Sequence, residues 1–173
     1  MSSYRMALTG FLACAISACS HQQPLDVVDS VDIERFMGKW YVIANIPTFI
    51  EKGAHNAIES YRLDDDGTIA TTFTFKDESF EGELKTYQPR GFVSEESNAI
   101  WGMQFVWPIK ADYRIIYLDE LYSITVIGRN KRDYVWIMAR EPEISKQAYS
   151  DILEMLESVG YDLNQIKKVP QRW

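Results

Sequence analysis

The residue types that most often carry catalysis or bind metals are scarce in this chain and are not grouped. Both cysteines, Cys14 and Cys19, fall in the first twenty residues, and the two histidines, His21 and His55, lie in separate segments without strand-like or helix-like patterning. No pair of histidines can therefore bind a metal ion or complete a catalytic triad. We predict no metal and no cofactor, and we predict that the protein is not an enzyme.

The acidic residues do not define a site either. The run Asp64-Asp65-Asp66-Gly67 lacks the spacing and the distal glutamate of a calcium loop, and it is typical of a hairpin turn. Glu59 and Glu83 could lie near each other in a barrel, but the sequence does not pair them as glycosidase carboxylates. A lipid-modifying enzyme remains an alternative, for which Tyr113 and Tyr117 are the only hint.

Length and composition indicate one folded domain. The chain has 173 residues, of which 46% are hydrophobic and 25% charged, so it can bury a core and is not disordered. Its net charge of −7 argues against nucleic acid as a partner, because phosphate binding needs a basic surface.

The first residues have the pattern of an export signal. Arg5 precedes an apolar run from Met6 to Ile16 that is too short to span a membrane. The sequence Ile16-Ser17-Ala18-Cys19 resembles the lipobox of bacterial lipoproteins, which implies cleavage before Cys19 and lipid on its thiol and amine. An ordinary secretory signal with an incidental cysteine is the alternative.

The lipobox resemblance divides the chain into three parts. Residues 1–18 are predicted to be a lipoprotein signal peptide, residues 19–30 a lipidated tether, and residues 31–173 the folded domain. Ser20, rather than an aspartate, follows the cysteine, and in bacterial lipoproteins this implies sorting to the outer membrane of a Gram-negative cell. We expect the domain to face the periplasm and to contact outer-membrane lipids.

Short runs with alternating apolar residues, separated by turn residues, predict an all-β region. Pro89 and Gly91 predict a bend or break in the fourth run. Even spacing without a long crossover predicts eight strands in an up-and-down antiparallel barrel. The predicted strands are 40–46, 56–63, 68–75, 84–93, 99–106, 112–118, 122–128 and 134–140.

Two helical segments flank the predicted barrel. Residues 31–36 suit a short helical turn that Asp32 could cap, and a longer helix begins after Ser145 and ends near Gly160. The longer helix should pack on the outside of the barrel through an apolar stripe. This stripe contains Ala148, Ile152, Met155, Leu156 and Val159.

Two motifs mark the ends of the strand-rich region. Gly38-Lys39-Trp40-Tyr41 opens it, and residues 134–140 close it with Arg140. This arrangement resembles the lipocalins, in particular the bacterial lipocalins carried on the outer membrane. In an up-and-down barrel Trp40 and Arg140 meet at one end, and the resemblance implies that they close the base together with Gly38. A guanidinium stacked on an indole is a favourable contact.

Strand alternation predicts which side chains point into the barrel, where small residues such as Ala44 and Gly102 beside aromatic ones favour a cavity over a filled core. A structural lipoprotein with a filled barrel is the alternative. The predicted cavity residues are Val42, Ala44, Phe73, Phe75, Met103, Phe105, Tyr113, Ile115, Tyr117, Tyr134, Trp136 and Met138.

The loops at the open end are predicted at residues 47–55, 76–82, 107–111 and 129–133. Their cations could meet a phosphate head group or an anionic membrane surface, and Trp107 could enter the membrane interface or cover the cavity. A solvated hairpin is the alternative for the last loop. The predicted rim residues are Trp107, Lys110, Arg129, Lys131 and Arg132.

These features together predict a lipid-anchored lipocalin that binds, stores or carries a hydrophobic ligand. The resemblance implies a fatty acid or a lysophospholipid as the ligand and maintenance of the cell envelope as the role. The sequence leaves open whether the chain forms a homodimer.

Overall fold

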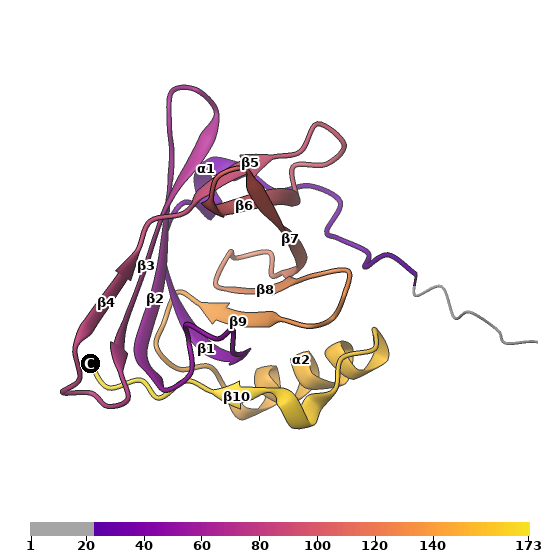
Figure 1. The fold of residues 1–173 in the computed structure, drawn as a ribbon. Coiled ribbons are helices and arrows are strands. Elements are labelled where there is room, and N and C mark those ends of the chain that lie inside the picture. Colours follow the sequence, from indigo (N-terminus) through magenta and orange to yellow (C-terminus); the bar gives the residue numbers. More distant parts are fainter. Residues whose placement is uncertain (1–22) are drawn as a thin grey trace, which may run out of the picture.

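The computed structural model describes residues 23–173, so the predicted signal peptide and the predicted lipidation site, Cys19, lie outside the described residues. The strands form one antiparallel sheet that closes on itself through pairing between the first strand, β1 (Gly38–Ile46), and β9 (Val135–Ala139). The predicted eight-stranded barrel is confirmed (Figure 1). The strands between them are β2 (Ala54–Leu63), β3 (Thr68–Asp77), β4 (Leu84–Tyr87), β5 (Arg90–Val93), β6 (Ile100–Val106), β7 (Ile109–Leu118) and β8 (Ile124–Gly128).

The predicted break in the fourth strand is confirmed. Both β4 and β5 pair with β3, and they count as one interrupted strand of the barrel. Pro89 separates them and has no backbone N–H to donate to a strand ladder. Its carbonyl instead accepts a hydrogen bond from the N–H of Thr71 at 3.2 Å.

The base of the barrel is closed by the short helix α1 (Ile33–Phe36), which Asp32 caps as predicted. Phe36 is fully buried and packs against Trp40 with ring centroids 5.1 Å apart. Trp101 and Tyr61 surround the same ring. These aromatic side chains fill the half of the barrel next to α1, so any hollow must lie nearer its open end.

Helix α2 (Lys146–Ser158) packs on the outside of the barrel, as predicted. Ser145 caps it by accepting a hydrogen bond from the N–H of Ala148, and Gly160 adopts a φ of 93° just beyond its end. Ile152 and Leu156 are its buried residues and face side chains of β1, β8 and β9. Figure 1 shows the helix lying across these strands. Within the part of the chain that is described, no helix has the length and apolar content needed to cross a membrane.

The segments at the two ends of the domain are tied to the barrel. Leu25, within the predicted tether, is 4% exposed, and its N–H donates to the Asn130 side chain at 2.8 Å. The tether prediction is therefore wrong for the residues from Leu25 onwards, because their apolar side chains pack on the barrel. After the 3-10 helix η1 (Leu163–Gln165), the two-residue strand β10 (Lys167–Lys168) pairs with β1. Gln171 then bridges β1 and β2 by donating to the carbonyls of Val42 and Ala57.

Two bulges change the side-chain alternation that the sequence predicts. Ile43 is an extra residue between Val42 and Ala44 in the pairing of β1 with β9, and Ile116 is one between Ile115 and Tyr117 in the pairing of β7 with β8. An extra residue in a strand shifts the side chains that follow to the opposite face of the sheet. The inside and outside of the barrel therefore exchange partway along both strands.

Candidate functional site

The base holds the predicted contact between Arg140 and Trp40. The Arg140 guanidinium lies 3.8 Å from the centroid of the Trp40 ring and donates hydrogen bonds to the carbonyls of Lys39, Arg35, Phe36 and Met37. The bonds to Arg35, Phe36 and Met37 satisfy carbonyl groups at the end of α1 that have no partner within the helix. One arginine thus joins the last strand to the first strand and to the helix that plugs the barrel.

Gly38 allows this close approach. Its φ is +94°, a backbone conformation that favours glycine, and a Cβ atom there would lie 3.4 Å from a guanidinium nitrogen of Arg140. The three predicted base residues Gly38, Trp40 and Arg140 are therefore neighbours.

A cavity of about 430 Å³ occupies the half of the barrel away from this base. Its walls are mostly aromatic and aliphatic, with a few polar groups. Six predicted cavity residues line it: Phe73, Met103, Phe105, Tyr113, Tyr134 and Trp136.

Four other predicted cavity residues point into the barrel but do not reach the cavity. Val42, Phe75, Ile115 and Met138 belong to the buried cluster that fills the barrel around Trp40. Phe75 is covered by Phe73 and Tyr87, whose ring centroids lie 5.4 and 6.2 Å from its own. The prediction that these four residues line the cavity is wrong. Packing around the base makes the hollow shorter than the barrel and removes Val42, Ile115 and Met138 from its lining, whereas Phe75 is covered by the two neighbouring rings.

The remaining two predictions, Ala44 and Tyr117, fail because of the bulges. Ala44 packs in the outer cluster beneath α2, and Asn45 takes the inward position instead. Tyr117 is 36% exposed. Gly102, also expected to make room for a cavity, faces outward, and a Cβ atom there would lie 3.1 Å from the Lys110 side chain.

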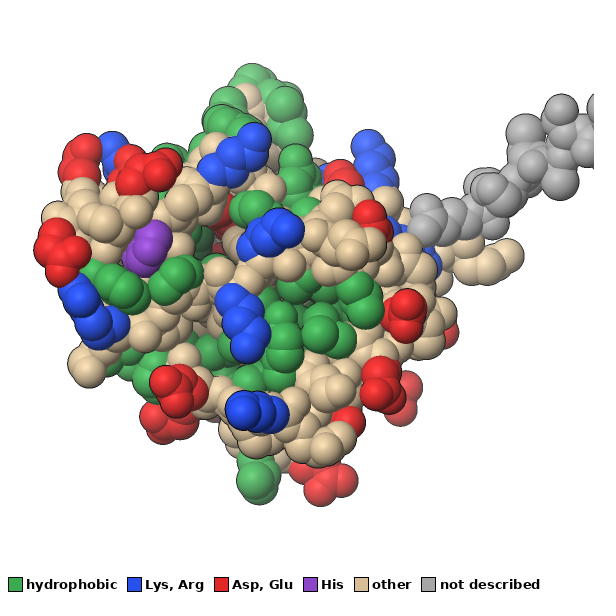
Figure 2. All heavy atoms as spheres, turned by 90° about the horizontal axis from the view of Figure 1, so that it is seen from below, with side chains coloured by type: hydrophobic (Ala, Val, Ile, Leu, Met, Phe, Trp, Pro, Cys, Tyr) green, Lys and Arg blue, Asp and Glu red, His purple; other side chains and the backbone are tan. Residues whose placement is uncertain are grey.

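The predicted loop at residues 107–111 is a two-residue turn, because β6 continues to Val106 and β7 begins at Ile109. Trp107 at the tip is 81% exposed, and Val106 and Ile109 beside it are 68% and 70% exposed. The space-filling view shows an apolar knob that projects from the molecule (Figure 2). Phe105 and Val106 at this hairpin also line the cavity, so the apolar hairpin adjoins the cavity mouth.

The predicted rim cations are dispersed. Arg129 lines the cavity and pairs with Asp133 at 3.4 Å, and Lys131 is exposed. Arg132 instead donates to the carbonyl of Val159 at the end of α2. Lys110 lies in β7 on the outside of the barrel, with its ammonium 3.6 Å from the centroid of the Phe92 ring. Arg132 and Lys110 are thus both held against neighbouring elements, and the contact of the rim residues with a head group or a membrane stays a prediction.

Two buried glutamates that were not predicted as site residues also line the cavity. Glu51 follows β1, and its carboxylate accepts hydrogen bonds from the Trp136 indole at 2.8 Å and from the N–H of Thr48 at 2.9 Å. Burial raises its pKa, and these hydrogen bonds oppose the rise. Glu51 thus fixes the orientation of Trp136 in the cavity wall.

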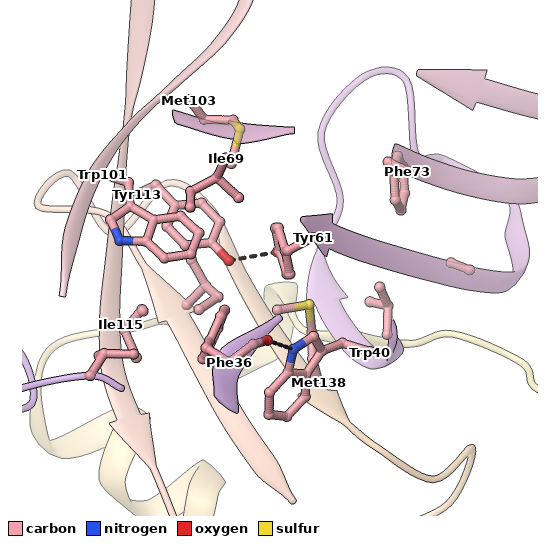
Figure 3. Packing of buried hydrophobic residues seen from close by; sticks show 14 of the residues in the cluster. Phe36, Trp40, Tyr61, Ile69, Phe73, Trp101, Met103, Tyr113, Ile115 and Met138 are labelled. Carbon is pink, nitrogen blue, oxygen red and sulfur yellow. Dashed lines mark hydrogen bonds between the residues drawn. The ribbon is translucent and has the colours of Figure 1, made fainter. Parts of the chain in front are cut away.

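Glu59 on β2 is 7% exposed, and burial raises the pKa of its carboxyl to about 8. Its neighbours on the same face of the strand, Ala57 and Tyr61, are also buried. A charged residue at an inward-facing position between two buried ones is the sequence signal that could have identified Glu59 as a site residue. The hydroxyls of its neighbours Tyr61 and Tyr113 are 2.6 Å apart and form the hydrogen bond that is drawn dashed in Figure 3. The inner end of the cavity is therefore polar, although its walls are apolar.

Among residues 23–173 no group of histidine, cysteine or acidic side chains is arranged to hold a metal ion. Additional lining residues come from the loop after β1, the end of β4 and the first half of β7. They are Thr48, Phe49, Ile50, Tyr87, Ala111 and Asp112.

Comparisons of the sequence and of the fold with known proteins point to the same family. The family model described as a lipocalin-like domain matches residues 31–171. An outer membrane lipoprotein, Blc, of Citrobacter freundii is 30% identical over 161 residues, covering 93% of this chain and 91% of its own. Temperature-induced lipocalin-1 of Arabidopsis thaliana is 29% identical, covering 88% and 86% of the two chains. Insecticyanin from Manduca sexta has a similar fold, with a TM-score of 0.67, 13% identity and coverage of 85% and 84%.

Proposed function

Because the chain belongs to the lipocalin family, we propose that it binds and carries a hydrophobic ligand with a single chain, such as a fatty acid or a lysophospholipid. The observation that supports this most directly is the cavity of about 430 Å³ above the Trp40 base. Burial of each methylene of an acyl chain contributes roughly 0.8 kcal/mol, so a long chain could support micromolar binding after the costs of association. A cavity of this size also argues against the alternative of a filled, purely structural barrel.

The charged groups of the lining suggest how such a ligand is oriented. Arg129 is the cation among the lining residues, and it follows β8 at the open end. Glu59 lies deeper, beside Trp40 at the closed end, where burial disfavours a charged group. An anionic head group should therefore stay at the mouth, with its acyl chain inside.

We also propose that the protein is anchored by lipid on Cys19 to the outer membrane of a Gram-negative bacterium and faces the periplasm. The lipobox-like sequence supports this, and the similar protein of Citrobacter freundii is named as an outer membrane lipoprotein. The apolar hairpin around Trp107 would let the cavity mouth touch the membrane surface, where ligand could enter. The resemblance to the bacterial lipocalins supports a role in cell-envelope maintenance. A homodimer through the same hairpin is an alternative use of this surface.

The proposed activity is non-covalent. A lipid-modifying enzyme would have to use Glu51, Glu59 or the Tyr61–Tyr113 pair, but Glu51 is occupied by Trp136 and the backbone of Thr48. Incubation of the purified protein with phospholipids should leave them intact. The appearance of a lysophospholipid or a free fatty acid, lost in a Glu59→Gln variant, would favour the enzyme.

Native mass spectrometry of protein extracted from membranes tests both parts of the proposal. The expected spectrum shows an acylated Cys19 and a bound species with the mass of a single-chain lipid. A Cys19→Ser variant should lose the acyl mass and keep the bound species. A wild-type protein that carries no lipid and does not change its tryptophan fluorescence on titration with fatty acids would contradict the carrier function.

A further inference from the structure

Glu59 lies at the closed end of the cavity. Its backbone pairs with Trp40 on one side and with Phe73 on the other. Trp40 closes the base, and Phe73 lines the cavity, so the Glu59 carboxyl lies where the hollow meets the packed core. The deepest part of a ligand would contact this carboxyl.

The hydrogen-bonding capacity of Glu59 is not used up within the described residues. The hydroxyl of Tyr61 can donate its proton to Glu59, which lowers the pKa of Glu59. The same hydroxyl also lies 2.6 Å from the hydroxyl of Tyr113, which competes for that proton. A phenol has one proton to donate, whereas a carboxyl group has two oxygens that accept. A buried polar group without partners is costly, so a ligand that supplies them binds more tightly. Glu51, by contrast, has three donors, from Thr48, Trp136 and Asn45.

The surroundings favour the uncharged form of Glu59. Burial has the largest effect on its pKa, which lies at about 8, and the negative charge of Glu51 adds to it. The titratable groups that face Glu59 are Tyr61 on its own strand, Tyr113 on β7 and Glu51 from the loop after β1. Asp112 and Arg129 line the same cavity nearer the mouth, and Arg129 is already paired with Asp133.

We propose that Glu59 and Tyr113 form a polar subsite at the closed end of the cavity that receives an uncharged hydroxyl group of the ligand. The preferred cargo is then an amphiphile with an uncharged polar end, such as a long-chain alcohol or a monoacylglycerol, bound with that end inward. A protonated carboxyl can donate one hydrogen bond to a hydroxyl oxygen and accept another from its proton. A fatty acid anion gains nothing there and binds with its chain inward. This inference rests on the proposed carrier function.

Binding of three ligands of one chain length tests the subsite: dodecanol, dodecanoate and dodecylamine. The protein is the full chain with Cys19→Ser, freed of lipid, and each ligand displaces a fluorescent apolar reporter at pH 7.

Replacement of Glu59 by leucine should weaken dodecanol binding about tenfold, the value expected for loss of one buried hydrogen bond. Dodecanoate binding should not weaken. Glu59→Gln should retain dodecanol binding, because an amide also donates and accepts. Glu95→Gln, at an exposed position, is the matched control and should bind as the wild type does.

Raising the pH from 7 to 9 gives a second measurement that needs no apolar variant. Ionisation of Glu59 should weaken dodecanol binding to the wild type, because the ligand would cover a charge, and should leave the Glu59→Gln variant unchanged. Equal dodecanol affinity in all variants and at both pH values would overturn the subsite while leaving the carrier function standing. A tighter, Glu59-dependent binding of dodecylamine would also overturn it, because Glu59 would then act as a counter-ion. If none of the three ligands displaces the reporter from the wild type, the carrier function itself is wrong.

Discussion

Neutralising Glu59 should stabilise the protein, and the gain should depend on pH. The pKa of this carboxyl is about 8 in the folded chain, against an ordinary value of 4.5. A group with a raised pKa holds its proton in the folded state at pH values where the unfolded chain has released it. The contribution of Glu59 to the free energy of unfolding is therefore most favourable below pH 4.5 and falls as the pH rises towards 8.

The size of the effect follows from the difference between the two pKa values. Each pKa unit corresponds to about 1.36 kcal/mol. The free energy of unfolding should drop by about 3 kcal/mol by pH 7 and by an amount on the order of 5 kcal/mol above pH 8. Glu59→Gln keeps the shape of the side chain but has no proton to release, so it should lose none of this stability.

Denaturant unfolding of both proteins at intervals from pH 5 to pH 9 measures the difference. The wild type and the Glu59→Gln variant should be close in stability at pH 5 and should diverge as the pH rises. Glu51, whose pKa burial also raises, is present in both proteins and largely cancels in the comparison. The Glu95→Gln control should follow the wild type. Curves that stay parallel from pH 5 to pH 9 would refute the argument, because they would mean that the ionised Glu59 carboxylate is well solvated in the folded chain.

Three further changes have defined outcomes. Arg140→Ala should lower the free energy of unfolding by about 3 kcal/mol in denaturant titrations, because it removes the stack on Trp40 and several charged hydrogen bonds, while the order of ligand affinities in a displacement assay stays the same. Trp107→Ser should reduce co-sedimentation with anionic phospholipid vesicles several-fold without a change in melting temperature, since its side chain is exposed; unchanged sedimentation would argue against membrane contact by this hairpin. Ser145→Ala should cost about 1 kcal/mol of stability by calorimetry through loss of the α2 cap, and a neutral result would mean that the helix end is held by packing alone.

Much of the fold could be predicted because its signals are local. Turn residues such as Asp66-Gly67 divide the chain into strands, Pro89 interrupts one of them, and Ser145 and Gly160 mark the ends of the helix. Antiparallel connectivity then brings the first and last strands together. The contact between Trp40 and Arg140 follows from this connectivity alone.

The candidate site was less predictable because it depends on how distant segments meet. Alternation along single strands placed Phe73, Met103 and Trp136 correctly in the cavity wall. It could not show that aromatic side chains from α1, β1, β2 and β6 fill the base of the barrel. This packing removes Met138 and Ile115 from the cavity lining. Loop residues such as Phe49 have no alternation to follow, so their orientation could not be predicted.

The sequence by itself determined the order of the strands and the apolar character of the barrel walls, because these depend on residue types at neighbouring positions. The end at which the barrel is closed was implied only by the resemblance to the lipocalins. Only the tertiary structure decided which way Ala44 and Tyr117 point, because a bulge arises from the pairing of two strands and reverses the alternation beyond it. It also decided that Glu59 meets the cavity with an uncharged carboxyl. Protonation depends on how much water surrounding segments exclude, and this is set only when β1, β3 and β7 close around the side chain.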